Sequence, residues 1–249
     1  MSFHIIIPAR YEAKRLPGKP LRDIAGKPMI QHVYERGMES GASSVTVATD
    51  DLHVENAVKE FGGNVVLTSD HHLSGTDRLA EAVQILDLGD HEIIVNLQGD
   101  EPLMSPELIG HVAEQLVTDK QADVATACIA IEDPDQVTDP NVVKVVFGQQ
   151  GHALYFSRAP IPWLRDEGEF GARKAWRHIG LYAYRCDYLQ SYAQLDSCWL
   201  EHHEALEQLR VLWHGGTIAV YETDSDPGHG VDTQEDLLKV RRLFGDESI

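Results

Sequence analysis

The sequence of 249 residues contains few cysteines and no long hydrophobic run. Its cysteines, Cys128, Cys186 and Cys198, are far apart and form no CxxC pair, so neither a disulfide framework nor a cysteine-bound zinc is indicated. No apolar stretch approaches the roughly twenty residues that a transmembrane helix needs. The apolar segment FHIIIP is too short for a signal peptide and lacks the basic start and the small-residue cleavage site. We therefore expect a cytoplasmic protein.

Positive charge is also scarce in this chain. It has 21 lysines and arginines against 40 aspartates and glutamates, which gives a net charge of −19 at pH 7. A protein that binds along a nucleic acid or on an anionic membrane needs an extended basic face, so we expect neither partner. The hydrophobic fraction of 43% is ordinary for a globular core, and the length suits one large α/β domain.

Several widespread catalytic fingerprints are missing as well. The chain has no Walker A sequence and no GxGxxG, so the usual support for a kinase or a dehydrogenase is absent. It also has no GxSxG nucleophile motif. The chemistry of the protein must therefore be sought in other residue patterns.

Strand-like and helix-like patterns alternate through the first half of the chain. Short runs rich in isoleucine and valine predict strands over residues 3–8, 44–49, 63–67, 92–97 and 124–131. Apolar residues at helical spacing predict helices over residues 29–40, 52–61, 76–86 and 106–118. Strands separated by helices of this length form crossovers in a largely parallel sheet. We expect an α/β fold of the Rossmann-like type, with a mixed, mostly parallel sheet flanked by helices.

The second half of the chain departs from this alternation. Strand-like runs over residues 142–147 and 153–157 have no helix between them and predict a hairpin that turns near residues 149–151. Further patterns predict a strand over residues 178–184, a helix over 201–212, a strand over 217–222 and a helix over 233–244. We expect a single domain, residues 1–249, with a smaller antiparallel lobe within about residues 132–200.

The loop after the first strand is basic, although the protein as a whole is acidic. The segment from Arg10 to Lys27 contains six basic residues, including Lys14, and only two acidic residues. In open α/β sheets ligands bind beyond the carboxyl ends of strands, and Gly18 lets the backbone approach an anion closely. The pattern indicates a site for a polyphosphate; a solvated basic loop is the alternative.

Two further segments place polar residues where a strand ends or a helix begins. In SGTDR, Ser74 or Thr76 can cap the helix, and Arg78 in its first turn would pair either with a bound anion or with Asp77 or Glu81.

In NLQGDEP, Asp100 follows a strand, and Ser105 is available to cap the next helix, so Asp100 is free to bind a metal ion. Asp232 is a second candidate ligand. It could instead cap the last helix, with Glu235 completing a capping box.

Eight ordered segments, considered together, resemble one enzyme family. They are IIIPARYEAKRLPGKPL, ATDD, SGTDRLAE, NLQGDEP, ALYFSRAPIPW, RHIGLYAY, LEQLRVLW and GVDTQEDL, and they run from residue 5 to about residue 240. They are similar to the 3-deoxy-manno-octulosonate (Kdo) cytidylyltransferases. The resemblance implies a nucleotide-diphospho-sugar transferase fold, transfer of CMP from CTP to Kdo with release of pyrophosphate, a Mg²⁺ requirement, a homodimer and a role in lipopolysaccharide biosynthesis.

The resemblance also assigns roles to individual residues of this chain. The implied triphosphate-binding residues are Arg10, Arg15 and Lys19. The implied Mg²⁺ ligands are Asp100 and Asp232, and the residues next to the nucleotide are Ser74, Arg78 and Gln98. The residues implied to hold Kdo are Gln98, His178, Tyr182, Glu207 and Gln208.

Two alternatives remain open at this point. A sister enzyme that activates 8-amino-Kdo shares most of these motifs. A non-catalytic nucleotide sensor could use the same fold, although such a protein has less need of a metal-binding pair of carboxylates.

Overall fold

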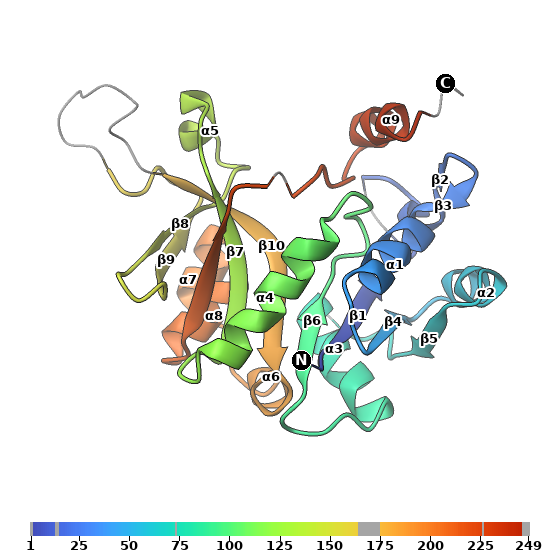
Figure 1. The fold of residues 1–249 in the computed structure, drawn as a ribbon, viewed down its shortest axis with the longest axis horizontal. Helices are drawn as coiled ribbons and strands as arrows, with labels where there is room; N and C mark the ends of the chain where they lie inside the picture. The colour runs from blue at the N-terminus through green and yellow to red at the C-terminus, as the bar shows by residue number, and fades with distance from the viewer. Residues whose placement is uncertain (1, 13–14, 73, 164–174, 226, 246–249) are drawn as a thin grey trace.

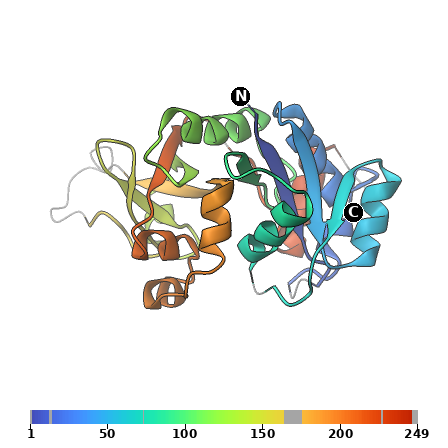
Figure 2. The same ribbon diagram turned by 90° about the horizontal axis from the view of Figure 1, so that it is seen from below.

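A computed structural model describes residues 2–12, 15–72, 74–163, 175–225 and 227–245 of the protein. Within these residues a nine-stranded sheet forms the centre, with the strand order β11-β7-β10-β6-β1-β4-β5 and with β8 and β9 attached through β10 (Figure 1). The β8–β9 hairpin lies at one end of the molecule, and α2 with β5 lies at the other (Figures 1 and 2). In the described part of the chain no helix is long and apolar enough to cross a membrane.

The parallel half of the sheet confirms the predicted crossovers. Strand β1 (His4–Ala9) lies between β4 (Ser44–Thr49) and β6 (Ile93–Asn96), and β4 pairs with β5 (Asn64–Leu67), all in parallel. The connecting helices are α1 (Met29–Glu39), α2 (Leu52–Glu60) and α3 (Gly75–Ile85).

The core lies on both faces of the sheet, which explains why the strands are almost wholly apolar. On β1, Ile5 and Ile7 enter one cluster with residues of α1 and α4 (Pro106–Thr118). Ile6 enters the opposite cluster with residues of α3. All three isoleucines are fully buried, so β1 is a central strand and its carboxyl end is held rigidly.

Antiparallel pairing begins at β10 (Trp176–Arg185), which lies between β6 and β7 (Val124–Ala130). The predicted hairpin is confirmed as β8 (Lys144–Phe147) and β9 (Ala153–Ser157). Strand β8 also pairs with β10, so the hairpin extends the main sheet.

The remaining elements are short or terminal. Strand β11 (Ile218–Thr223) closes one edge of the sheet, parallel to β7, and α9 (Gln234–Leu243) ends the described chain. The sequence patterns did not predict the elements η1 (Lys19–Leu21), β2 (Asp23–Ile24), β3 (Lys27–Pro28), α5 (Pro134–Thr138) and α6 (Cys186–Tyr192).

The prediction of one continuous helix over residues 201–212 is wrong. The structure has two short helices, α7 (Trp199–Glu204) and α8 (Gln208–Trp213), separated at Ala205, whose φ of 51° ends the first helix. Arg210 of α8 forms a largely buried, bidentate ion pair with Glu201 of α7. Its Nε lies 2.8 Å from Oε2 of Glu201, and its Nη2 lies 2.5 Å from Oε1. Apolar spacing alone contains no signal for this reversal.

Candidate active site

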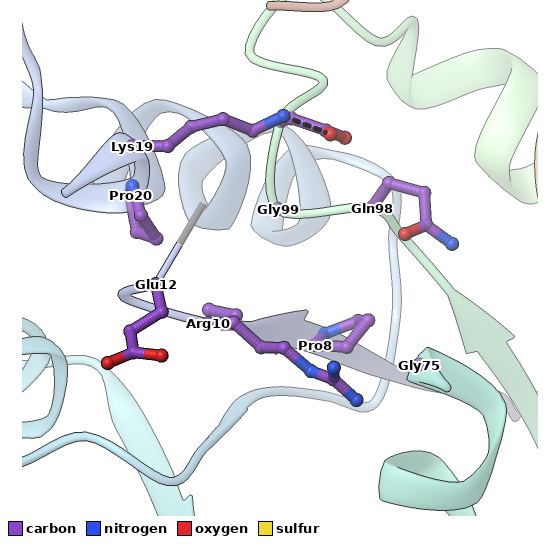
Figure 3. Close-up of a pocket in the computed structure, with 10 residues that line it drawn as sticks. Pro8, Arg10, Glu12, Lys19, Pro20, Gly75, Gln98 and Gly99 are labelled. Carbon is purple, nitrogen blue, oxygen red and sulfur yellow. Dashed lines mark hydrogen bonds and ion pairs between the residues drawn. The ribbon is translucent and has the colours of Figure 1, made fainter. Parts of the chain in front are cut away.

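A cavity of about 230 Å³ opens where the carboxyl ends of β1 and β6 meet the start of α3. Arg10 and Lys19 line it, together with Gly75, Gln98 and Asp100. Figure 3 shows Lys19 on one side of this cavity and Arg10 on the other. The basic loop therefore faces a hollow at the sheet edge where α/β proteins bind ligands.

Lys19 joins the two carboxylates that the sequence singled out. Its Nζ donates to Asp100 Oδ2 at 2.6 Å and to Asp232 Oδ1 at 2.9 Å. Arg15 adds a more exposed contact of 3.1 Å from Nη2 to Asp232 Oδ2. Burial opposes the charge on Lys19, but the two carboxylates outweigh it and raise the pKa of the ammonium group. Lys19 is therefore a permanent positive charge at physiological pH.

Asp232 is not used to start the last helix. The N-cap of α9 is Thr233, whose Oγ1 accepts from Asp236 N at 3.2 Å, and Asp236 Oδ2 in turn accepts from Thr233 N at 3.0 Å. The predicted capping box of Asp232 and Glu235 is therefore wrong by one residue. The correction leaves the Asp232 carboxylate facing Lys19 and Arg15.

Asp232 is held near Asp100 by close backbone packing. Val231 N donates to Asp100 O at 2.8 Å. Gly228 has a φ of 93°, and a Cβ on it would lie 2.7 Å from Leu103 O. A Cβ on Gly230 would lie 2.7 Å from Glu101 Oε1. The segment 228–231, here called the glycine strap, is thus packed tightly against the loop after β6, with no space for an added side chain at Gly228 or Gly230.

Glu101 is a residue of this site that the sequence reasoning missed. Desolvation, with the neighbouring Asp100 and Asp232, raises the pKa of the Glu101 carboxyl to about 8. Two features of the sequence could have pointed to Glu101: the adjacent acidic residues in NLQGDEP and the two glycines in GHG.

We expect Gly230→Ala to lower turnover by about tenfold or more, because the added methyl must displace Glu101 or the strap that carries Asp232. Steady-state release of pyrophosphate, the product that the family resemblance implies, would measure the effect. Gly26→Ala is not a suitable control, since its φ of 82° would add strain of its own; Gly110→Ala, whose Cβ would meet no atom closer than 3.7 Å, is the matched variant. Normal turnover of Gly230→Ala would show that the close packing has no part in activity.

The other predicted residues of the nucleotide region lie in different surroundings. Arg10 is exposed, and its Nη2 donates to His72 O at 2.5 Å and to Ser74 O at 3.3 Å. Ser74 is the N-cap of α3, with its hydroxyl accepting from Asp77 N at 3.1 Å. Lys14 lies outside the described residues.

Arg78 is completely buried beside this region and does not line the cavity. Its guanidinium donates to Thr68 Oγ1 at 2.5 Å and to Asp50 Oδ2 at 2.8 Å, in place of the expected pairs with Asp77 or Glu81. Arg78 therefore ties α3 to the ends of β4 and β5.

A second cavity of about 230 Å³ adjoins the first, and both are lined by Gly75 and Gln98. Tyr182 of β10 lines it, as do Glu207 and Gln208, which follow the break between α7 and α8. With the chain reversed at Ala205, both side chains lie at this cavity.

Glu207 lines this second cavity. Thr76 Oγ1 donates to Glu207 Oε2 at 3.2 Å. Desolvation inside the cavity raises the pKa of Glu207 although the residue as a whole is exposed. His178 does not line the cavity, but its ring centroid lies 5.4 Å from that of Tyr182.

The metal-binding potential of the site rests on Asp100 and Asp232. Both offer carboxylate oxygens to one cation, the ammonium of Lys19, which shows that a positive charge fits between them. Within the described residues no group of three or more potential metal-binding side chains comes together. Such a pair suits Mg²⁺ bound with a nucleotide, whose phosphates and waters supply the other ligands.

Comparison with known proteins gives consistent results. Residues 4–219 match the sequence model of a family described as cytidylyltransferase. A 3-deoxy-manno-octulosonate cytidylyltransferase of Idiomarina loihiensis is 51% identical and aligns over 99% of this chain and 100% of its own. One from Halorhodospira halophila is 53% identical over 97% of this chain and 96% of its own. A solved structure of CMP:2-keto-3-deoxy-manno-octonic acid synthetase complexed with CTP superimposes with a TM-score of 0.91 at 46% identity, covering 99% of each chain.

Proposed function

Since the chain belongs to the 3-deoxy-manno-octulosonate cytidylyltransferase family, we propose that it joins CTP and Kdo to form CMP-Kdo and pyrophosphate. The observation that carries this proposal is the pair of adjoining cavities, which share Gly75 and Gln98. The first is lined by the cations Arg10 and Lys19 beside the carboxylate of Asp100, and the second by hydroxyl, amide and carboxyl groups. Two substrates bound in these cavities would meet beside Gln98.

The first cavity suits the nucleotide. Arg10, Arg15 and Lys19 would bind the triphosphate of CTP, and the start of α3 at Gly75 adds the partial positive charge of a helix N-terminus. Ser74 caps this helix start, and the buried Arg78 holds it against the sheet. Gln98 would contact both nucleotide and sugar.

The second cavity suits the sugar acid. Tyr182, Glu207 and Gln208 line it and offer groups that hydrogen-bond hydroxyls, and His178 stands behind Tyr182. We propose that these residues bind Kdo.

In the reaction, the anomeric hydroxyl of Kdo attacks the α-phosphorus of CTP and loses its proton to solvent. The new P–O bond forms as the bond to the β-phosphate breaks, and pyrophosphate leaves with the electron pair. Negative charge accumulates on the phosphoryl oxygens, so positioning and charge stabilisation by Arg10 and Lys19 carry most of the catalysis. Asp100 and Asp232 would hold Mg²⁺, which would supply further positive charge for the phosphoryl transfer.

The decisive assay is pyrophosphate release on mixing the protein with CTP, Mg²⁺ and Kdo. We expect release that depends on all three components. CTP binding without sugar-dependent release would instead identify a nucleotide sensor. Competition between Kdo and 8-amino-Kdo would test the sugar preference, for which the family comparisons favour Kdo.

The remaining parts of the proposal concern the setting of the enzyme. We propose that residues 1–249 act as one cytoplasmic domain in lipopolysaccharide biosynthesis, with sugar binding and homodimerisation served by the region 132–200. Light scattering on the purified protein would measure the oligomeric state.

A further inference from the structure

Strand β10 carries a bulge beside the second cavity. Its pairing with β7 runs in register up to Ile179 opposite Ala127 and resumes at Tyr182 opposite Thr126. Two residues of β10, Gly180 and Leu181, therefore have no counterpart on β7. Bulges of this kind re-aim side chains and are frequent next to active sites.

The bulge changes which aromatic side chains can touch. His178 and Tyr182 are four residues apart, a separation of about 13 Å along a regular strand. Their partners, Cys128 and Thr126, are only two residues apart, a separation of about 7 Å. The bulge takes up the excess chain and brings the two rings to a centroid distance of 5.4 Å on the same face of the sheet.

Thr126 closes the bulge from the opposite strand. The residue is fully buried, and its hydroxyl lies 2.8 Å from Leu181 O and 3.1 Å from Ile179 O. The same hydroxyl lies 2.9 Å from Nε2 of His178. One side chain thus connects the looped-out backbone to the imidazole ring.

Counting protons assigns the donors and acceptors in this cluster. A hydroxyl has one proton, and the two carbonyl oxygens can only accept, so Thr126 donates to the backbone. Toward His178 the hydroxyl oxygen must then accept, which places a hydrogen on Nε2. Desolvation lowers the pKa of His178 to about 3, so the ring is neutral at physiological pH. The neutral ring with a hydrogen on Nε2 has a bare acceptor at Nδ1.

We propose that Thr126 is a positioning residue of the sugar site: it closes the bulge and holds His178 as the Nε2–H tautomer, so that the imidazole ring fixes the place of Tyr182 at the sugar cavity. Among the described residues Nδ1 of His178 has no hydrogen-bond partner, and Tyr182, which lies against the ring, lines the sugar cavity. This inference rests on the proposed function, since it names a residue that shapes the proposed sugar site.

The test uses two substitutions of the full-length enzyme. Thr126→Val keeps the shape of the side chain but removes the hydroxyl, and Thr126→Ser keeps the hydroxyl. We expect Thr126→Val to raise the KM for Kdo by about tenfold or more and to leave the KM for CTP within about twofold, because only the place of Tyr182 at the sugar cavity is disturbed. Thr126→Ser should restore the KM for Kdo. Thr46→Val, at a buried threonine of β4, is the control for removing a buried hydroxyl.

A spectroscopic readout separates this inference from the proposed function. ¹⁵N NMR of the histidine rings, with His178 assigned from the His178→Asn spectrum, should show the Nε2–H tautomer in the sugar-free enzyme and a loss of that single tautomer in Thr126→Val. An Nδ1–H tautomer in the wild type would overturn the inference even if CMP-Kdo is formed. Equal increases in both KM values in Thr126→Val would also overturn it, since they would indicate a general loss of structure. Failure of the wild type to release pyrophosphate would instead reject the proposed function, and the NMR result would still decide the tautomer.

Discussion

Lys19→Met should reduce pyrophosphate release by about a thousand-fold, which corresponds to roughly 4 kcal/mol of lost transition-state stabilisation. The reason is the position of the ammonium group, 2.6 Å from Asp100 and 2.9 Å from Asp232, on the wall of the proposed nucleotide cavity. Methionine fills similar space, so the loss is one of charge. Without that charge, Asp100 and Asp232 also face each other with no cation from Lys19 between them.

The control for this variant is Lys27→Met. Lys27 belongs to the same N-terminal basic region, but its ammonium pairs with Glu35 at 2.8 Å and its side chain is 44% exposed. We expect normal turnover and a similar melting temperature for Lys27→Met. If Lys19→Met kept near-normal turnover, or lost activity only because it unfolds, Lys19 would have to be removed from the catalytic machinery.

Asp100→Asn should lower turnover by about a hundred-fold or more and raise the Mg²⁺ concentration needed for half-maximal activity. The amide retains the shape of the side chain and one oxygen, but it removes the negative charge that faces Lys19 and a bound cation. Direct Mg²⁺ titration by calorimetry, with CTP present, would report the weaker binding independently of turnover.

Asp90→Asn is the matched control for this second variant. Asp90 is exposed in the turn before β6, at the opposite end of the strand from Asp100. It should leave both turnover and the Mg²⁺ requirement unchanged. An unaltered Mg²⁺ requirement in Asp100→Asn would mean that the metal is held elsewhere.

The sequence patterns predicted most of the regular structure. Strand β4 and helix α4 have the predicted bounds, and the β8–β9 hairpin turns where expected. These elements depend on apolar periodicity, on helix caps and on turn residues, all of which are encoded within a few neighbouring positions.

The errors occur where side-chain contacts, rather than apolar spacing, decide the local conformation. The helix expected over residues 201–212 breaks at Ala205, where the ion pair of Arg210 with Glu201 stabilises the reversal. The cap of α9 belongs to Thr233 because the Asp232 side chain is held by Lys19 and Arg15. Arg210 and Glu201 are nine residues apart, a spacing that gives no sign of a break, and Lys19 lies 213 residues from Asp232.

The residues of the candidate site show the same difference between local sequence properties and long-range contacts. Sequence alone placed a basic loop after β1 and a carboxylate after β6, since residue type and position relative to a strand are local properties. Only the tertiary structure brings Lys19 to Asp100, 81 residues away, and to Asp232, 213 residues away. The two-residue bulge that joins His178 to Tyr182 is likewise a matter of register between β7 and β10. Such contacts depend on how whole strands and loops pack, and short-range periodicity contains no information about that packing.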